Sequence, residues 1–531
     1  MKKLLLLGDE ALAQGAIDAG ISGFYGYPGT PSTEIIEYVQ QNKVAIEKNI
    51  HRTWASNEKT AMESAVGMSY AGKRTMATMK HVGLNVAADP FMNSAMTGAN
   101  GGLLVAVADD PSMHSSQNEQ DSRIFANFAL IPCIEPSDQQ ECYDAAKHGF
   151  ELSEKFKLPV LVRLVTRLSH SRSGVVQKEM INENKMKTPE DPNQFMLLPA
   201  FSRTKYNRLV PLQAELEKAS EESPLNKYID GSDKSLGIIA CGLGYNYLME
   251  NVSKNNLKNP ILKVSQYPLP RKYVEKIMNE CDQVLVIEDG MPVVEQQLKG
   301  YVNGNTKIKG RLDGSLPRVG ELNPNHVAKA LNLADIHGQV IPDVVAGRPP
   351  ALCVGCPHAD TFKALKEAIK DETNARVFGD IGCYTLGFMP PYKAINTTLD
   401  MGASITMAKG ASEAGLFPAI ATIGDSTFFH SGMTGLMDCI YDKSNVVIVI
   451  LDNSTTGMTG GQEYTGHGRI EAVCKGLGVE ADHIRVITPL PKQHEENIKV
   501  FQEEMAYEGV SVIIPRRECV QTLKKKLKSR R

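Results

Sequence analysis

Two polar side chains follow two buried apolar segments in the last third of the chain. Residues 417–423 form a short apolar run, and Gly424-Asp425-Ser426 comes directly after it. A second apolar run, residues 445–451, ends at Asp452-Asn453. Runs of this length and composition are typical of parallel strands that are buried on both faces. Because such sheets bind ligands at the carboxyl ends of their strands, we expect Asp425 and Asn453 to face one site.

The ligand set predicted at this sheet edge consists of hard oxygen atoms. Carboxylate and amide oxygens suit Mg²⁺, which takes few protein ligands and completes its shell with phosphate oxygens. We expect the backbone carbonyl of Thr455 to be a third protein ligand. A single strand that ends in Gly-Asp predicts only a turn. A second strand that ends in Asp-Asn at this spacing is typical of the metal and diphosphate pocket of thiamine enzymes, so we predict thiamine diphosphate and Mg²⁺ here. The predicted cofactor contacts, where small residues let phosphates approach closely, are Gly402, Ser404, Gly424, Ser426 and the two metal ligands.

Thiamine chemistry also needs a carboxylic acid at atom N1′ of the aminopyrimidine ring. Proton exchange at N1′ lets the 4′-nitrogen remove the proton from C2 of the thiazolium ring. Glu58, early in a predicted helix that begins near residue 57, is the candidate for this acid. A glutamate taken alone is more often a surface charge, and Glu63 is a rival on the same helix.

Composition limits the class of protein. A chain of 531 residues, 42% of them hydrophobic, should form about three domains. A net charge of -3 does not suggest the strongly basic surface that is typical of nucleic-acid-binding proteins. The apolar run at residues 4–7 is too short for a signal peptide, and no run of 18 apolar residues predicts a membrane span. The ten cysteines do not form a dense disulfide framework, so we expect reduced thiols and a cytoplasmic protein.

The order of the predicted elements indicates an α/β protein with several parallel-sheet domains. Residues 1–176 alternate short apolar strands, such as 75–79, 102–108 and 159–165, with helical patterns. Residues 177–232 are polar and read as a connecting arm. Residues 233–345 resume the α/β pattern with strands at 236–240 and 283–288, and residues 346–531 form the last unit.

Three motifs make the chain similar to a known family. They are GYPGTPS at 26–32, MKHVGLN at 79–85 and ADDPSMHSSQNEQDSR at 108–123. They resemble the alpha subunit of indolepyruvate:ferredoxin oxidoreductase, within the thiamine-dependent 2-oxoacid:ferredoxin oxidoreductases, and the resemblance extends over essentially the whole length. It implies doubly wound domains of three kinds: pyrimidine-binding, transketolase C-terminal-like and diphosphate-binding. It also implies an enzyme of class EC 1.2.7.8, which oxidatively decarboxylates indolepyruvate and other aryl pyruvates with coenzyme A and ferredoxin.

The first two motifs supply candidate substrate contacts. Residues 27–31 read as a strand-to-helix turn, with Thr30 as N-cap and Pro31 as the first helical residue. An exposed helix N-terminus favours an anion, and in the related pyruvate enzymes the matching threonine approaches the substrate carboxylate. Lys80 and His81 offer a cation and a proton carrier near the reacting carbonyl. The alternative for His81 is a hydrogen-bonded core histidine.

A set of cysteines in the last unit suggests electron transfer. The pair Cys353 and Cys356 has a C-x-x-C spacing that suits zinc, a redox disulfide or iron–sulfur. The resemblance implies that Cys353, Cys356, Cys383 and Cys519 ligate one [4Fe-4S] cluster. Four thiolates also suit tetrahedral Zn²⁺, which is the chemical rival. The other six cysteines are expected to be small apolar core residues.

The partners follow from the family and from one departure. Longer members continue past the cysteine that matches Cys519 into a ferredoxin-like domain, whereas this sequence has no C-x₂-C-x₂-C-x₃-C-P run. We therefore expect a short form that passes electrons to ferredoxin or to a separate iron–sulfur subunit. The family also implies a small beta subunit and an alpha–alpha dimer within a heterotetramer. The alternatives are a non-oxidative thiamine-dependent decarboxylase that releases an aldehyde, and a non-catalytic subunit that retains the fold.

Overall fold

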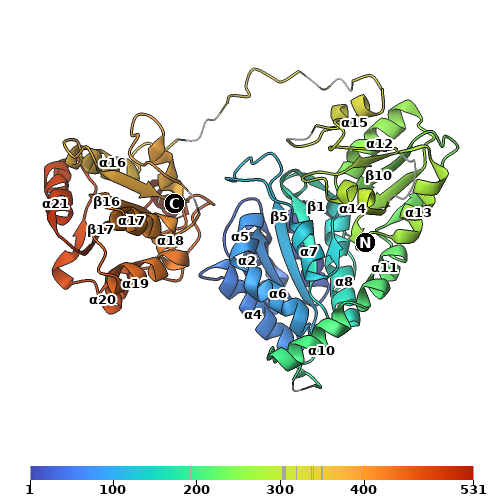
Figure 1. The fold of residues 1–531 in the computed structure, drawn as a ribbon, viewed down its shortest axis with the longest axis horizontal. Helices are drawn as coiled ribbons and strands as arrows, with labels where there is room; N and C mark the ends of the chain where they lie inside the picture. The colour runs from blue at the N-terminus through green and yellow to red at the C-terminus, as the bar shows by residue number, and fades with distance from the viewer. Residues whose placement is uncertain are drawn as a thin grey trace. The chain divides into compact units, whose positions relative to one another are not determined.

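The chain forms two compact units. The computed structural model describes residues 2–529 except 192, 302–306, 318–319, 336–337, 339, 348–350 and 399. Unit 1 comprises Met1–Val340 and unit 2 comprises Ile341–Arg531. Their elements are labelled in Figure 1. Among the described residues, no helix is both long and apolar enough to cross a bilayer.

The larger sheet of unit 1 has seven strands in the order β12, β6, β7, β5, β4, β2, β3. All neighbouring strands are parallel except β12, which is antiparallel to β6. The strands are β2 (Gly23–Gly26), β3 (His51–Trp54), β4 (Thr75–Lys80), β5 (Leu103–Asp109), β6 (Cys133–Ile134), β7 (Val160–Val165) and β12 (Gln266–Tyr267). Strands β5 and β7 are buried along their whole length, as their continuous apolar runs predicted.

Helices cover both faces of this sheet. Along β5, Leu104 and Ala106 enter one hydrophobic core while Leu103 and Val105 enter another, because successive strand residues point to opposite faces. The first core includes residues of α1 (Gly8–Asp18), α2 (Thr33–Gln41) and α8 (Gln139–Phe156). The second includes residues of α4 (Glu58–Tyr70), α5 (His81–Val86), α6 (Ala88–Thr97) and α7 (Ser122–Ala129). The arrangement is the doubly wound one that the strand–helix alternation predicted.

Short elements complete the margin of this domain. Strand β1 (Lys3–Leu7) pairs antiparallel with β8 (Arg172–Val176) in a separate two-stranded sheet. Helix α3 (Lys43–Glu47) leads into β3, and helix α9 (Thr166–Ser169) follows β7. The N-terminal apolar run is thus a strand that holds the chain's start against the end of the first domain.

The second sheet of unit 1 has five strands in the order β14, β13, β10, β11, β9. They are β9 (Lys227–Ile229), β10 (Gly237–Cys241), β11 (Ile261–Val264), β13 (Gln283–Ile287) and β14 (Lys307–Lys309), and only β9 is antiparallel to its neighbour. The accompanying helices are α12 (Gly244–Asn255), α13 (Arg271–Glu280), α14 (Val293–Tyr301) and α15 (Pro324–Ala330). Strand β12 lies between β11 and β13 in the chain, yet it joins the larger sheet, which ties the two sheets together.

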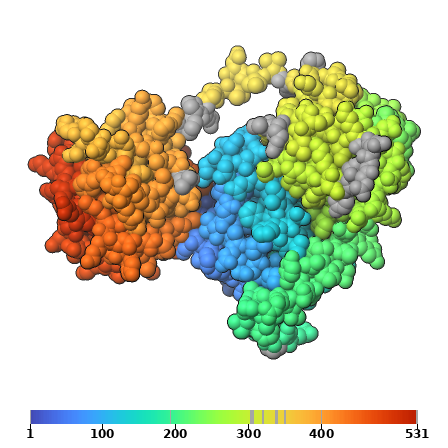
Figure 2. Space-filling model, in the orientation of Figure 1, coloured from blue at the N-terminus to red at the C-terminus, as the bar shows by residue number. Residues whose placement is uncertain are grey.

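The polar segment 177–232 is built into unit 1. It contains α10 (Pro199–Leu209), α11 (Leu212–Glu221) and strand β9. Helix α10 contacts α6, and α11 contacts α13 and β12. The space-filling view shows these helices in green along the lower side of unit 1 (Figure 2). The segment therefore packs against elements of both sheets.

A buried ion network also links the two sheets of unit 1. Arg163 on β7 is fully buried, and its Nε lies 2.6 Å from Asp109 Oδ2. Arg123 pairs with Asp121 at 2.6 Å and, across to the second sheet, with Glu288 at 3.0 Å. Removing one partner of such a pair would leave a buried charge uncompensated, which typically costs about 3–5 kcal/mol. Part of the motif at 108–123 thus has a structural role.

Unit 2 contains one sheet of five parallel strands in the order β15, β16, β17, β19, β18. They are β15 (Arg376–Gly379), β16 (Ala419–Gly424), β17 (Val446–Leu451), β18 (Ile484–Ile487) and β19 (Val510–Pro515). The helices are α16 (Pro357–Ala368), α17 (Ala403–Glu413), α18 (Asp425–Thr427), α19 (Met433–Tyr441), α20 (Ile470–Leu477), α21 (His494–Ala506) and α22 (Val520–Ser529), with 3₁₀ turns at Cys383–Phe388, Ala481–His483 and Pro491–Gln493. The two strands predicted at 417–423 and 445–451 are confirmed as β16 and β17.

The helix predicted at 428–441 is only partly regular. A π-helical turn, Phe428–Gly432, separates α18 from α19. Turns of this kind are frequent at functional sites. This one directly follows Asp425.

Candidate functional site

Four neighbouring strand ends bring the candidate residues of unit 1 to one sheet edge. Strands β5, β4, β2 and β3 are consecutive and parallel, so their carboxyl ends lie together. Glu58 follows β3, and Thr30 follows β2. Lys80 ends β4 and His81 begins α5, while Asp110 follows β5. This is the edge at which sheets of this class bind ligands.

Glu58 and its rival Glu63 differ in environment. Glu58 is the first residue of α4 and is 5% exposed, with Asn57 as its N-cap. Glu63 lies on the solvent side and pairs with Lys59. A Cβ atom placed on Gly83 would lie 2.5 Å from Glu58 Oε1, so the carboxyl group packs directly against the backbone of α5. The structure therefore favours Glu58 as the buried acid.

Substituting Gly83 by alanine is expected to displace the Glu58 carboxyl group. The clash should lower the free energy of unfolding by about 1–3 kcal/mol. Gly67, an exposed glycine of α4 with nothing within 4 Å of an added Cβ, is the matched control. Gly67→Ala should stabilise the helix by about 0.5–1 kcal/mol. Thermal unfolding of the two variants measures the difference, and an unfolding midpoint for Gly83→Ala at or above the wild-type value would contradict the packing described.

The predicted capping role of Thr30 is wrong. Helix α2 begins at Thr33, and its N-cap residue is Ser32. Both the backbone N–H and the hydroxyl of Ser32 donate to Gly29 O, and the N–H of Gly29 donates to Thr33 Oγ1. These bonds close a turn ahead of the helix, so Thr30 and Pro31 precede it. The Thr30 hydroxyl is consequently not committed to capping and stays a candidate substrate contact.

Ser115, in the loop that follows β5, links Lys80 with the loop that contains Thr30. Lys80 Nζ donates to Ser115 O at 3.0 Å, and Ser115 Oγ donates to Thr30 O at 3.3 Å. Asp110 holds Ser115 through the backbone N–H at 2.8 Å. Burial lowers the pKa of Lys80 to about 8, although the Asp110 and Glu58 carboxylates favour its charged form. A cation is thus held beside Thr30 and near Glu58.

His81 is a buried histidine. Its Nε2 lies 3.1 Å from the carbonyl oxygen of Asn118. Burial, and then the charge of Lys80, lower the pKa of His81, so the ring is neutral at physiological pH. The hydrogen bond to Asn118 O agrees with the alternative that His81 is a hydrogen-bonded core histidine. His81 nevertheless lies beside Lys80, at the sheet edge where the other candidate residues lie.

In unit 2, the ends of β16 and β17 meet as predicted. Asp425 and Asn453 are both buried, and Ser426 Oγ lies 2.9 Å from Thr456 Oγ1, which joins the two strand-end loops. Asp425 Oδ1 accepts the N–H of Ser426, but Oδ2 has no hydrogen-bond partner among the described residues. Burial and the neighbouring Asp452 raise the pKa of Asp425 to about 8. A buried carboxylate with an unpartnered oxygen fits a divalent cation, which would replace the proton.

Both polar atoms of the Asn453 side chain have hydrogen-bond partners. Its Oδ1 accepts the N–H of Thr455 at 3.1 Å, and its Nδ2 lies 3.1 Å from His358 Nε2. Burial lowers the pKa of His358 to about 4, so this ring is a neutral acceptor that orients the amide. Thr455 is buried and donates from Oγ1 to Gln462 O. Whether the Thr455 carbonyl binds metal stays a prediction. Sequence reasoning assigned no role to His358, although it stands directly beyond the C-x-x-C pair.

Gly402 and Ser404 lie at the start of α17, and their backbone N–H groups both donate to Asp380 Oδ2. Ser404 Oγ donates to the same oxygen at 2.6 Å, and the Tyr384 hydroxyl donates to Asp380 Oδ1. Gly402 has φ +97°, which favours glycine. Asp380, to which sequence reasoning assigned no role, therefore organises the predicted phosphate loop.

The four predicted cluster ligands converge within unit 2. The N–H of Cys356 donates to Cys353 O, and the N–H of Cys519 donates to Asn453 O at 3.0 Å. Burial and the charges of the other three thiols raise the pKa of Cys383 to about 12. A Cβ on Gly457 would lie 3.4 Å from Cys383 Sγ and 3.6 Å from Asn453 Nδ2. The four thiols thus lie near one another, and Cys383 and Cys519 lie close to the predicted metal ligand Asn453.

The spacing of these thiols is wider than a zinc site needs. Zn–S bonds of about 2.3 Å place the four sulfurs of a tetrahedral site about 3.8 Å apart. Among the described residues, no three of these cysteine sulfurs lie within 4.8 Å of one another. Whether these thiols hold a [4Fe-4S] cluster or a zinc ion stays a prediction. The remaining cysteines are buried, as predicted: Cys133, Cys142, Cys241, Cys281, Cys439 and Cys474.

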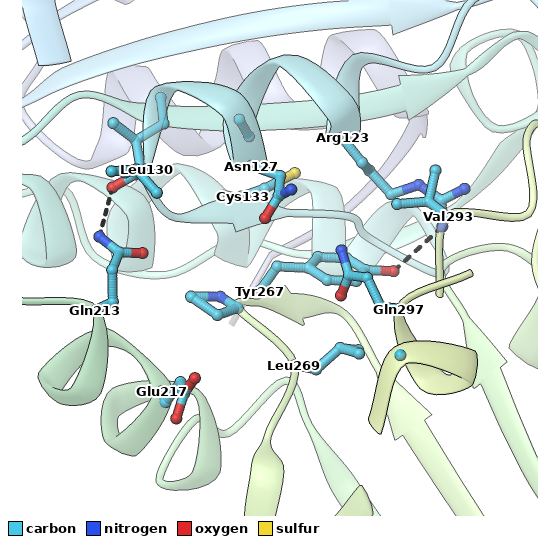
Figure 3. A pocket seen from close by; sticks show the side chains of 14 residues that line it. Arg123, Asn127, Leu130, Cys133, Gln213, Glu217, Tyr267, Leu269, Val293 and Gln297 are labelled. Carbon is cyan, nitrogen blue, oxygen red and sulfur yellow. Dashed lines mark hydrogen bonds between the residues drawn. The ribbon is translucent and has the colours of Figure 1, made fainter. Parts of the chain in front are cut away.

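A cavity of about 440 Å³ lies elsewhere in unit 1. Its lining includes Asn127, Gln213, Tyr267 and Gln297, and the Gln213 amide donates to Leu130 O at one side of it (Figure 3). Arg123 also lines it, but its charge is already paired in the buried network. None of the predicted site residues lines this cavity.

Comparison with known proteins identifies the family. Over 98% of its length the chain is 41% identical to the indolepyruvate oxidoreductase subunit IorA of Archaeoglobus fulgidus and 40% identical to that of Pyrococcus horikoshii, covering 86% of each. The chain belongs to the IorA family. Residues 14–208 of the chain match the thiamine diphosphate-binding domain of pyruvate flavodoxin/ferredoxin oxidoreductases. Residues 380–515 match the C-terminal binding domain of thiamine pyrophosphate enzymes. Both domain matches support binding of thiamine diphosphate.

A solved structure confirms the fold of this IorA-family chain. It is similar to a 2-oxoglutarate:ferredoxin oxidoreductase from Magnetococcus marinus, with a TM-score of 0.51 and 17% identity over 62% of this chain and 65% of that one. The likeness concerns the arrangement of α/β domains. The predicted family and fold class are both confirmed.

Proposed function

We propose that the chain is the catalytic alpha subunit of an oxidoreductase that converts indolepyruvate and other aryl pyruvates to the aryl-acetyl-CoA, CO₂ and reduced ferredoxin. One observation supports the oxidative reaction above all. In unit 2 the candidate metal ligand Asn453 lies close to two of the four predicted cluster cysteines, because its O accepts the N–H of Cys519 and its Nδ2 and Cys383 Sγ both approach Gly457. A non-oxidative decarboxylase would need the first site without the second. A small beta subunit, a second alpha subunit and a cytoplasmic location complete the proposal.

Residues of both units have roles in the proposed reaction. Thiamine diphosphate supplies the electron sink for decarboxylation when it is bound. Asp425, Asn453 and the Thr455 carbonyl hold the Mg²⁺ ion, and the four cysteines hold a [4Fe-4S] cluster. Glu58 exchanges a proton with N1′ of the aminopyrimidine ring. Thr30 and Lys80 bind the substrate carboxylate, and His81 lies beside them.

Anaerobic co-purification with the partner subunit tests this function. The complex should contain about four iron atoms per alpha chain from this cluster, beyond any iron of its partner, and show the broad iron–sulfur absorbance. Dye reduction with indolepyruvate and phenylpyruvate should require coenzyme A and exceed that with pyruvate or 2-oxoglutarate. Release of an aldehyde without dye reduction would instead assign a non-oxidative decarboxylase. Absence of any turnover in a cofactor-loaded complex would assign a non-catalytic subunit.

The pH dependence should report the charge of Lys80. Its pKa is about 8, so the cation that attracts the substrate carboxylate is present below pH 8 and lost above it. We expect kcat/KM for indolepyruvate to fall as the pH rises through 8, since this parameter reports groups of the free enzyme. Lys80→Arg should move the fall to higher pH because arginine stays charged. Lys59→Arg, on the surface of α4, should leave the profile unchanged. An identical profile for Lys80→Arg and the wild type would reject Lys80 as the group.

A further inference from the structure

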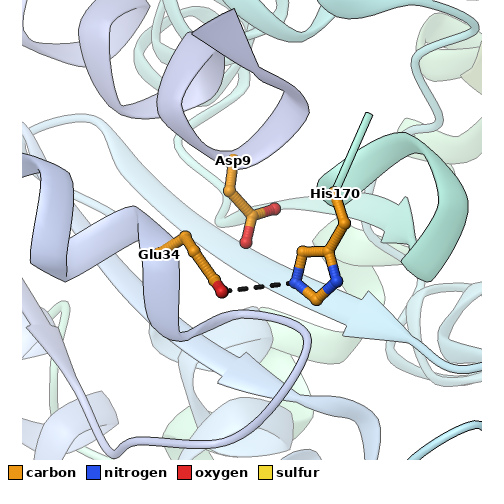
Figure 4. A group of neighbouring side chains, drawn as sticks. All are labelled: Asp9, Glu34 and His170. Atoms are coloured by element: carbon orange, nitrogen blue, oxygen red, sulfur yellow. Dashed lines mark ion pairs between the residues drawn. The ribbon is translucent and has the colours of Figure 1, made fainter. Parts of the chain in front are cut away.

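Three side chains from separate elements of unit 1 meet outside the site described above. Asp9 lies in the first turn of α1, Glu34 lies in α2, and His170 follows α9. One ligand atom of each lies within 4.8 Å of the other two. Figure 4 shows the Asp9 carboxyl group pointing toward the other two side chains.

Asp9 is the unusual member of this group. It is 0% exposed, and in the part of the chain that the structure describes neither carboxyl oxygen has a hydrogen-bond partner of acceptable geometry. Burial raises the pKa of Asp9 to about 8, with the nearby Ser169 hydroxyl opposing the shift and Glu34 adding to it. A buried carboxyl group without partners is costly unless it binds a proton or a cation.

The surroundings give a cation both access and attraction. His170 is an exposed residue, so the group opens to solvent on that side. A hollow of about 450 Å³ beside it is lined by Glu10, Glu34 and Glu37, together with Tyr38, Gln41 and Asn42. Arg172 pairs with Glu10 at 3.3 Å and His170 with Glu34 at 3.3 Å, and three glutamates together line the hollow, which favours the approach of a cation.

We propose that Asp9, Glu34 and His170 bind a divalent metal ion of the zinc type. Zinc accepts imidazole nitrogen together with carboxylate oxygen, and three protein ligands leave one position for water. Metal binding would replace the ion pair between Glu34 and His170 and the proton on Asp9. It would tie the start of α1 to α2 and to the residue after α9. None of these residues takes part in the thiamine or cluster sites proposed above, so the inference does not depend on the proposed function.

Equilibrium dialysis of the cofactor-loaded complex against micromolar Zn²⁺, with Mg²⁺ and thiamine diphosphate saturating, tests this site. The wild type should retain about one zinc ion per chain more than Asp9→Asn or His170→Gln. Asn matches the shape of a protonated Asp9, and His170 is exposed, so both variants should fold, which circular dichroism verifies. Glu37→Gln, on the hollow but outside the group, should keep the extra ion.

Two further measurements locate the ion. Zinc should raise the thermal unfolding midpoint of the wild type and of Glu37→Gln, but not that of the other two variants, because a ligand stabilises only the state that binds it. Anomalous diffraction at the zinc edge should show a peak between the three side chains. Equal zinc content in all four proteins would overturn the proposal. The three side chains would then only stabilise the packing of α1, α2 and the residue after α9. Zinc held at the cysteines would be common to all four and would not affect the comparison.

Discussion

Replacing Glu58 by glutamine is expected to lower kcat for aryl-pyruvate oxidation by about 10²–10⁴-fold, the range that a positioned acid–base group contributes. Glutamine has the shape of the glutamic acid side chain but cannot exchange a proton with N1′. Glu58 is buried at the start of α4, with its carboxyl group packed against Gly83. The isosteric change should therefore preserve the packing and remove only the chemistry.

The matched control is Glu63→Gln on the same helix. Glu63 is exposed and pairs with Lys59, so its loss should change kcat by less than about twofold, as for most surface ion pairs. Affinity for thiamine diphosphate, measured by calorimetry, should stay within about tenfold of wild type for Glu58→Gln, which is about 1.4 kcal/mol. Wild-type kcat in Glu58→Gln would show that another group supplies the acid.

Replacing Cys356 by alanine is expected to remove the iron–sulfur cluster. Three thiols would remain, and the loop from exposed Cys353 to buried His358 would lose the buried ligand Cys356. Iron from this site should fall from about four atoms per chain toward zero, with loss of the visible absorbance. Dye reduction should disappear together with the iron, because no neighbouring acceptor would take electrons singly.

Cys439→Ala is the control for this experiment. Cys439 lies buried in α19 and is not part of the converging set, so its replacement should cost about 1 kcal/mol of stability and leave the iron content unchanged. Zinc in place of iron in the anaerobic wild type would contradict the cluster and support the rival tetrahedral site. Aldehyde production that survives in Cys356→Ala would show that decarboxylation and oxidation are separable.

Much of the architecture of the last unit was predictable from local sequence. The apolar runs at 417–423 and 445–451 are typical of buried parallel strands, and the polar residues that follow such strands meet at one sheet edge. The burial of Asp425 and Asn453 follows from the same pattern. The buried positions of the six non-ligand cysteines were likewise predictable, because isolated thiols in apolar runs behave as small hydrophobic residues.

The start of α2 was predicted wrongly because two signals competed. Threonine followed by proline is a common helix start. Here Ser32 and Thr33 form bonds back to Gly29 that place the start later. Several rival starts lie within four residues, and only the course of the preceding loop decides among them.

Contacts between distant segments could not be predicted. Lys80 reaches Ser115, Asn453 reaches His358, and Gly402 reaches Asp380, each across a sequence separation that no periodicity encodes. The same is true of Arg123 and Glu288, whose pairing holds two sheets together. Each bond depends on how whole elements pack.

The sequence by itself determined the strands, the doubly wound class, the family and the identity of the candidate ligands, because these depend on local apolar patterns and on motifs of adjacent residues. The tertiary structure decided which of two glutamates is buried, which amides Asp380 holds, and that four thiols converge beside Asn453. It also revealed the group formed by Asp9, Glu34 and His170. Burial and electrostatic environment arise only when segments far apart in the chain exclude water from one another.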